Sequence, residues 1–252
     1  MPKLSVTIIT KDEEANIERA LESVPFADEI VVVDSGSKDR TCEIAGRYTD
    51  RVLFNEWPGH VKQKQFAVDA AAHDWILSID ADEQVSDELA LKIKDLLSSQ
   101  SDADACEVNR RTFYLGRWIS HSGWYPDRRI RLFDRRKARW GGYDPHDWVV
   151  CDGRIRRINA DLLHYPYRDV SHHMKKIDSY TTIMAERLFE KGKRATIPDI
   201  LFRPGFAFFK KLVFKAAYLD GYPGLVVAGT SALSVLFKYV KLRELERGQP
   251  KG

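Results

Sequence analysis

Residues Ile76–Glu83 read ILSIDADE, a mostly apolar run that leads directly into three acidic side chains. The apolar run is typical of a buried strand in a parallel sheet. Asp80 and Asp82 are two positions apart, so in an extended strand end their side chains point the same way. Two carboxylates that face one object suit Mg²⁺ or Mn²⁺, which also bind substrate phosphates. The alternative is an acidic turn before a helix, capped by Asp82 or Ser86.

The residues before this stretch alternate between β-branched runs and helical apolar spacings, which predicts β-α-β-α units and a right-handed parallel sheet. Three of the expected strands end in Thr10, Asp34 and Asp80. Since the carboxyl ends of parallel strands share one edge of a sheet, a single ligand site is expected there. The expected strands are Leu4–Thr10, Glu29–Asp34, Arg51–Phe54 and Ile76–Asp80.

The composition allows a large core but does not indicate nucleic-acid binding. The chain has 252 residues, 44% of them hydrophobic, which fits one large domain or two closely packed halves. The 40 basic residues nearly balance the 37 acidic ones, for a net charge of +3. The basic residues are concentrated between 110 and 157, which indicates either a solvated basic face or a surface for anionic lipid or a phosphorylated acceptor.

The cysteines and the N-terminus predict a cytoplasmic protein. Cys42, Cys106 and Cys151 are an odd set without a Cys-x-x-Cys pair, which favours reduced thiols over disulfides or a zinc framework. The first apolar run is short and soon interrupted by charge, so no signal peptide is expected.

Three motifs in order resemble the inverting family 2 glycosyltransferases with the GT-A fold: SVTIITKDEE at 5–14, VVDSGSKDRT at 32–41 and DAD at 80–82. The end of the chain is similar to the lipopolysaccharide-core glucosyltransferase branch of that family. The resemblance implies a Rossmann-like, mostly parallel sheet flanked by helices, with a C-terminal helical extension. It also implies a nucleotide-sugar donor, usually UDP-linked, and a divalent cation.

The resemblance assigns Thr10 and Glu14 to the edge of the nucleotide base and ribose. It assigns Asp34 to the uracil ring N–H, and a carboxylate is a strong, acceptor-only partner for such a donor. Lys62 matches a position near the donor diphosphate, and either Lys62 or Lys64 is a sensible phosphate contact. An exposed helix lysine without a ligand is the equal alternative.

The resemblance implies that Asp80 lies near the ribose and the metal and that Asp82 binds the metal directly. His164 ends an expected strand, where family members often complete the metal site with a histidine. Taken alone, such a residue is more often a hydrogen-bonded structural histidine.

The stretch 142–148 reads GYDPHDW and matches the place where the family carries its general base. Asp147 is the expected base, with His146 orienting it or touching the donor phosphates. Asp144 stays open as an alternative, because the pair at 146–147 differs from the commoner forms. Proton removal by a positioned carboxylate contributes about 10²–10⁴-fold to a rate.

Three parts of the chain are expected: residues 1–104 as the nucleotide-sugar half, 105–200 as the acceptor half and 201–252 as amphipathic helices. Gly221–Phe237 carries no charge but spans only 17 residues, against about 20 needed to cross a bilayer. Its basic and aromatic neighbours favour a membrane-surface position over an ordinary helical hairpin.

The sequence thus predicts a metal-dependent enzyme, peripheral on the inner face of the cytoplasmic membrane. It would move one sugar to a lipopolysaccharide-core or other lipid-linked glycan. The resemblance to the lipopolysaccharide-core branch implies that this sugar is glucose and that the donor is UDP-glucose. The processive motif Gln-x-x-Arg-Trp is absent from the sequence. The rivals are a nucleotidyltransferase, which usually needs a glycine-rich loop where Lys11–Glu14 stands, and a non-enzymatic membrane- or nucleic-acid-binding protein.

Overall fold

A computed structural model describes residues 2–99, 102–143 and 146–248. It divides the chain into two compact units: unit 1 comprises 1–111 with 127–165, and unit 2 comprises 112–126 with 166–252. These divisions differ from the expected parts at 1–104, 105–200 and 201–252. The reason is that the strands at 105–114, 127–134 and 155–164 hydrogen-bond into the same sheet as the strands of residues 1–104.

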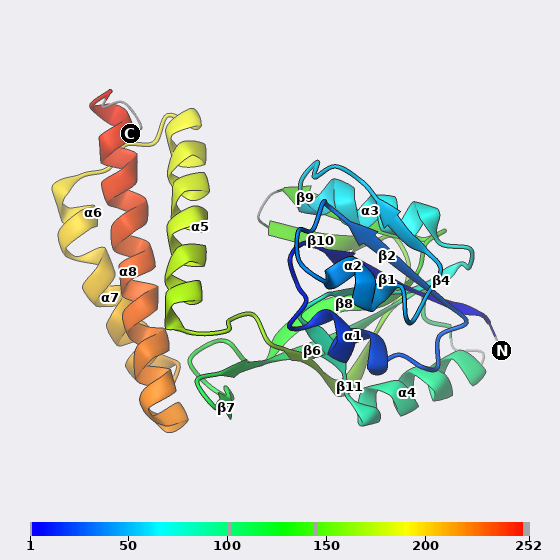
Figure 1. The fold of residues 1–252 in the computed structure, drawn as a ribbon. Coiled ribbons are helices and arrows are strands. Elements are labelled where there is room, and N and C mark those ends of the chain that lie inside the picture. Colours follow the sequence, from blue (N-terminus) through cyan, green and yellow to red (C-terminus); the bar gives the residue numbers. More distant parts are fainter. Residues whose placement is uncertain (1, 100–101, 144–145, 249–252) are drawn as a thin grey trace. The chain divides into compact units, whose positions relative to one another are not determined.

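Unit 1 is built on a mixed sheet of order β3-β2-β1-β4-β8-β6-β11-β5, with β7 paired to β6 (Figure 1). The first four strands are parallel, as the sequence predicts, while β8 and β5 join antiparallel to their neighbours. A separate hairpin pairs β9 with β10. The strands are β1 (Leu4–Thr10), β2 (Glu29–Asp34), β3 (Val52–Phe54), β4 (Trp75–Asp80), β5 (Glu83–Val85), β6 (Ala105–Tyr114), β7 (Arg117–Trp118), β8 (Asp127–Asp134), β9 (Ala138–Tyr143), β10 (His146–Cys151) and β11 (Ile155–His164).

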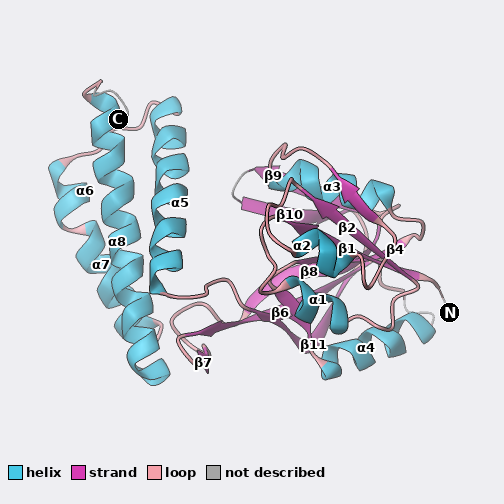
Figure 2. Ribbon diagram, in the orientation of Figure 1, coloured by secondary structure: helices cyan, strands magenta, loops and turns pink. Residues whose placement is uncertain are grey.

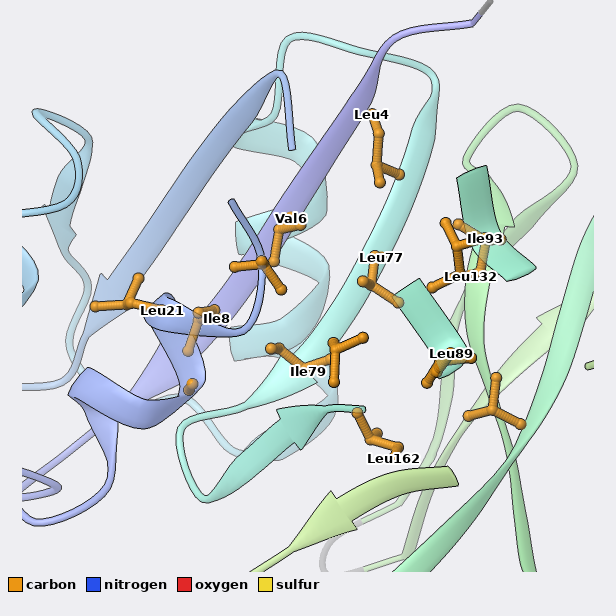
Figure 3. Packing of buried hydrophobic residues seen from close by; sticks show 14 of the residues in the cluster. Leu4, Val6, Ile8, Leu21, Leu77, Ile79, Leu89, Ile93, Leu132 and Leu162 are labelled. Atoms are coloured by element: carbon orange, nitrogen blue, oxygen red, sulfur yellow. The ribbon is translucent and has the colours of Figure 1, made fainter. Parts of the chain in front are cut away.

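Helices cover both faces of this sheet because its strands carry apolar side chains on both sides. On one face Leu77 and Ile79 pack with α1, α2 and α4, and Figure 3 shows part of this cluster. On the other face Val31 and Ile76 pack against α3 and the β9–β10 hairpin. The helices are α1 (Ile17–Glu22), α2 (Thr41–Ala45), α3 (His60–Ala70) and α4 (Asp87–Ser98). The α/β class predicted from the sequence is therefore confirmed.

Unit 2 is mainly helical (Figure 2), and α5 packs along α8 through Ala185 and Leu242. Asp220 ties the 112–126 segment to this helical part. Its buried carboxylate accepts hydrogen bonds from the backbone of Ser120 and His121, both at 3.0 Å. The elements are α5 (Val170–Glu190), α6 (Ile197–Leu201), α7 (Arg203–Phe209), the π-helical turn η1 (Lys210–Phe214), the 3₁₀ turn η2 (Ala217–Asp220) and α8 (Gly221–Glu246).

The C-terminal helix is longer than the uncharged run that the sequence shows at 221–237. Among the described residues, the segment Ala217–Glu246 is the one long and apolar enough to cross a bilayer by length and composition alone. Only 22% of its most apolar window is buried inside the structure.

Gly224 gives a test of how α8 packs on η2. A Cβ at this position would lie 1.8 Å from the carbonyl oxygen of Ala217, whereas a Cβ at Gly229 would meet no described atom within 4 Å. We expect Gly224→Ala to lower the free energy of unfolding by about 1–3 kcal/mol. Gly229→Ala should raise it by about 0.4–1 kcal/mol, because alanine reduces the entropy of the unfolded chain. Urea unfolding of the two variants measures both changes in the free energy of unfolding. Equal changes in the two variants would contradict the close packing of Gly224 on η2.

Candidate active site

The expected strand ends do lie on one edge of the sheet. In the parallel register Thr10 is the partner of Asp34, and Ile9 is the partner of Asp80. The hydroxyl oxygen of Thr10 is buried and has no hydrogen-bond partner among the described residues. Since buried polar atoms are normally satisfied, this orphan oxygen marks a place where a polar ligand would fit.

Asp34 is buried and organises the turn that follows β2. Its carboxylate accepts hydrogen bonds from the backbone N–H groups of Gly36 at 2.8 Å and Ser37 at 2.9 Å, and from the Ser37 hydroxyl. Gly36 has φ +85°, a conformation that favours glycine. Burial, followed by the negative charge of Asp34, raises the pKa of the nearby Cys42 thiol to about 11.

Two loops at this edge are joined by reciprocal hydrogen bonds. The backbone N–H of Asp12 donates to the Ser37 hydroxyl at 2.8 Å, and the N–H of Lys38 donates to the Asp12 carboxylate at 2.7 Å. Glu14 accepts a hydrogen bond from the backbone of Arg40 at 3.1 Å. The predicted nucleotide residue Glu14 thus also has a structural contact in the loop.

Lys64 is the central cation of the site. Its ammonium group lies 2.9 Å from Asp80 Oδ1 and 2.7 Å from Asp147 Oδ2, so it connects β4 to the β9–β10 hairpin. The ammonium group also lies 4.5 Å from the ring centroid of Trp140. Lys64 is 4% exposed because Gln63, Lys64, Ala67 and Val68 form the buried face of α3.

Lys62, the predicted diphosphate contact, lies on the exposed side of the same helix. Two residues along an α-helix correspond to about 200°, so Lys62 and Lys64 point in nearly opposite directions. The structure therefore brings Lys64 together with the acidic strand end, and it does not place Lys62 in the same ion-pair network.

Arg131 is the second buried cation, and the sequence did not single it out. Its guanidinium donates to Asp80 at 2.9 Å and to Glu83 at 2.5 Å. Glu83 is 1% exposed and also accepts a hydrogen bond from the backbone of Asp80 at 3.0 Å. The alternation along β8 places Arg131 on the side opposite Ile130 and Leu132, together with Arg129, and this pattern favoured a basic surface.

The ion pairs decide the protonation of both acids. Burial alone would raise the pKa of Asp80, but the charges of Lys64 and Arg131 hold it well below its usual range. Burial likewise opposes ionisation of Asp147, and the charge and hydrogen bond of Lys64 outweigh it and lower its pKa. Asp147 is therefore a carboxylate at neutral pH.

The predicted metal ligands are only partly brought together. Asp82 Oδ2 lies 3.5 Å from His164 Nε2, and both side chains are mostly buried. The carboxylate of Asp80 instead contacts the two cations. In residues 2–99, 102–143 and 146–248, no three His, Cys, Asp or Glu side chains form a group that could hold a metal ion. A carboxylate oxygen and an imidazole nitrogen nevertheless suit Mn²⁺ when diphosphate and water complete the shell, whereas Mg²⁺ prefers oxygen ligands alone.

The β9–β10 hairpin presents Asp147. Asp147 is paired with Gly142, whose φ is +98° and whose added Cβ would lie 2.5 Å from the carbonyl oxygen of His146. A glycine is thus required for the hairpin to close. His146 is exposed and its ring packs against Tyr143. The alternative base Asp144 lies outside the described residues.

Comparison with known proteins identifies the family. Residues 5–163 match the family model "Glycosyl transferase family 2". The chain belongs to this family. The glycosyltransferase is 29% identical to the lipopolysaccharide core biosynthesis glycosyltransferase LpsC of Rhizobium meliloti over 251 residues, with 96% of this chain and 93% of the relative covered.

The glycosyltransferase is also 31% identical to the uncharacterized glycosyltransferase RT0209 of Rickettsia typhi, with 97% of this chain and 88% of the relative covered. Among solved structures, S. aureus TarS 1–349 in complex with UDP-GlcNAc has a TM-score of 0.50 at 15% identity, with 98% of this chain and 92% of that chain covered. This likeness shows the fold. Family membership confirms the predicted enzyme class. It excludes the two alternatives, a nucleotidyltransferase and a non-enzymatic binding protein.

The role of Lys64 can be tested against its neighbour on the helix. Lys64→Met leaves two partly buried carboxylates without their shared cation, so we expect a loss of about 3 kcal/mol of unfolding free energy at neutral pH. Lys62→Met, at an exposed position, should change it by less than about 0.5 kcal/mol. Urea unfolding at neutral pH measures both variants.

The same pair predicts a pH dependence. Because the pKa values of Asp80 and Asp147 are lowered in the folded state, their contribution is fully present above the ordinary Asp pKa of 3.8 and is lost as the pH falls through the lowered values. The stability difference between the unaltered protein and Lys64→Met should therefore shrink in acid. A difference that stays constant on acidification would contradict this assignment.

Proposed function

We propose that this glycosyltransferase transfers one sugar, with inversion, from a UDP-linked donor such as UDP-glucose to a lipopolysaccharide-core or other lipid-linked glycan. The observation that carries this proposal is the contact of one ammonium group, that of Lys64, with both Asp80 and Asp147. This contact supports the proposal because Asp147, the proposed base, and Asp80, at the proposed donor site, share one cation. The similarity to LpsC, a lipopolysaccharide core biosynthesis glycosyltransferase, supports the acceptor class, and the likeness to TarS, which binds UDP-GlcNAc, supports the uridine donor.

Asp147 is the proposed general base. The acceptor O–H gives its proton to the Asp147 carboxylate as its oxygen bonds to the anomeric carbon, and the bond from that carbon to the diphosphate oxygen breaks. The ion pair with Lys64 keeps Asp147 ionised before the reaction. A donor diphosphate would compete for the Lys64 ammonium, and withdrawal of that charge would make Asp147 a stronger base.

The donor contacts are proposed at the strand ends. Thr10, Glu14 and Asp34 would bind the base and ribose, and the orphan hydroxyl of Thr10 is the feature that best supports this placement. Lys62 remains a proposed diphosphate contact from the exposed side of α3. Lys64 is better placed for the same task, because its ammonium group already lies between two site carboxylates.

Asp82 and His164 would hold a divalent cation. Asp80 would lie near that cation, because it is two residues before Asp82 in the sequence. When bound, the cation would stabilise charge on the departing diphosphate. Arg131 holds Asp80 in place through its hydrogen bond of 2.9 Å. Asp82 is fixed in turn, because its carbonyl oxygen accepts a hydrogen bond from the backbone of Tyr165 at 2.8 Å.

We further propose that the enzyme works at the cytoplasmic face of the membrane, where a lipid-linked acceptor is accessible. The LpsC relative and the apolar α8 support this location. A nucleic-acid partner is not proposed. Arg135 and Arg136 from the basic cluster contact Asp74, and Arg136 also pairs with Asp134, so these charges are already balanced.

Replacement of the base tests the mechanism. Asp147→Asn should lower the rate of sugar transfer by at least about 10²-fold, because the amide cannot accept the proton. Binding of the nucleotide donor, measured by calorimetry, should remain. Asp152→Asn, an exposed carboxylate next to the same hairpin, should transfer sugar at the rate of the unaltered enzyme. Full activity of Asp147→Asn would exclude Asp147 as the base.

Calorimetric titration with UDP tests the metal site. In the presence of Mn²⁺ we expect Asp82→Asn or His164→Gln to weaken UDP binding by about 10- to 100-fold. The exposed variant Asp87→Asn should bind as the unaltered protein does. A UDP affinity that Mn²⁺ does not change would exclude the metal, and an undiminished Mn²⁺ response in Asp82→Asn would exclude that ligand.

A further inference from the structure

The segment from α6 to the start of α8 exposes an unusual number of large apolar side chains. Phe202, Phe206, Phe209 and Phe214 are between 61% and 77% exposed. Large apolar side chains normally lie inside a protein, and contiguous exposed ones mark an interaction site. We name this set the aromatic surface: Leu201, Phe202, Phe206, Phe209, Val213, Phe214, Tyr218, Leu219, Tyr222 and Leu225.

Three of the elements that carry this surface contribute no buried residue to their unit. These elements are α6, α7 and η1 in the described structure. Helix α7 packs along α8, yet Phe206 and Phe209 on α7 remain exposed. Helices of this length are not stable alone in water, and most of their stability comes from covering an apolar face. An additional surface that covers these side chains is therefore expected.

The accessible charges around the aromatic surface are positive. Between residues 200 and 243 the sequence contains a single acidic residue, Asp220. The Asp220 side chain is fully buried and accepts hydrogen bonds from the backbone N–H groups of Ser120 and His121 and from the Ser122 hydroxyl. Lys210 and Lys215 are exposed beside the phenylalanines. The whole surface is thus aromatic and basic, with no accessible acid of its own among the described residues.

These features select the kind of partner. A second copy of the chain would bring an equally basic patch to a two-fold interface, and the like charges would repel. The interfacial region of an anionic bilayer accepts both components, because phenylalanine, tyrosine and leucine enter the boundary of the acyl chains while lysines contact anionic headgroups. The hydroxyl of Tyr218 suits the wet side of that boundary, whereas the hydroxyl of Tyr222 donates a hydrogen bond to the carbonyl oxygen of Leu115 at 2.9 Å.

We propose that the aromatic surface docks on an anionic lipid bilayer and lies in its interface without crossing it. This deepens the membrane location in the proposed function and rests on it. The tight packing at the start of α8 favours an interfacial position, since Pro223, Gly224, Val227 and Ala228 are buried against their own unit. Docking would hold the enzyme at the surface that displays a lipid-linked acceptor.

Vesicle co-sedimentation of the full-length protein, without donor or acceptor, tests the proposal. Vesicles of equal parts phosphatidylglycerol and phosphatidylcholine should bind the protein, and vesicles of phosphatidylcholine alone should bind it much more weakly. Lys210→Gln with Lys215→Gln should weaken binding by about 30-fold. Phe209→Ser with Phe214→Ser should weaken it by at least about 100-fold.

Matched controls come from unit 1. Leu91→Ser changes an apolar side chain that is 62% exposed on α4, and Lys137→Gln with Arg139→Gln removes two exposed charges from the basic cluster. Both should bind anionic vesicles as the unaltered protein does. A loss in the controls equal to that in the aromatic-surface variants would overturn the assignment, as would equal binding to both kinds of vesicle.

Extraction separates docking from spanning. Protein docked in the interface should be released from the vesicles by alkaline carbonate, whereas protein that resists carbonate would show that α8 crosses the bilayer and would overturn the proposal. Dimerisation without vesicle binding would point instead to a second copy as the partner. Because these experiments measure no sugar transfer, a protein that does not bind vesicles would leave the proposed reaction untouched. Likewise, a protein that does not bind UDP would leave the vesicle-binding result untouched.

Discussion

The ammonium group of Lys64 connects parts of the chain that are far apart in sequence, since Asp147 lies 83 positions after it. A buried cation without partners would cost several kcal/mol, and so would either carboxylate alone. Helix α3, the end of β4 and the β9–β10 hairpin therefore cannot take their positions independently. The ion pairs specify one arrangement of the catalytic edge rather than adding stability beyond what an apolar core would give.

The same network separates the roles of similar side chains. Asp80 faces two cations and stays ionised over the whole physiological range, which suits a fixed charge that positions other groups. Asp147 faces one cation, and that cation is the group an incoming diphosphate would attract. Asp82 shares its surroundings with His164 rather than with Lys64. Three acids within one site thus have three different electrostatic environments, and the difference comes from which strand or hairpin carries each.

Much of the fold could be predicted from the sequence because it depends on local patterns. The bounds of β1 and β2 agree with apolar runs that end in polar residues, and the shared edge follows from parallel topology alone. The sequence left the phosphate contact open between Lys62 and Lys64. Helical periodicity would have favoured Lys64, because it lies three residues before the buried Ala67 and so shares its face of the helix. The pairing of Asp147 with Gly142 and the inward position of Arg131 depend on contacts between distant segments, which no local pattern contains.

The reciprocal hydrogen bonds between the loops at 11–14 and 35–41 have a consequence for donor recognition. Because Asp12, Ser37 and Lys38 already fix these loops to one another, their conformational entropy is lost when the protein folds and not when a nucleotide arrives. A nucleotide then meets a preorganised surface, so more of its contact energy appears as affinity. Side chains that never touch the ligand, Asp12 first among them, would in this way help to set how tightly it is held.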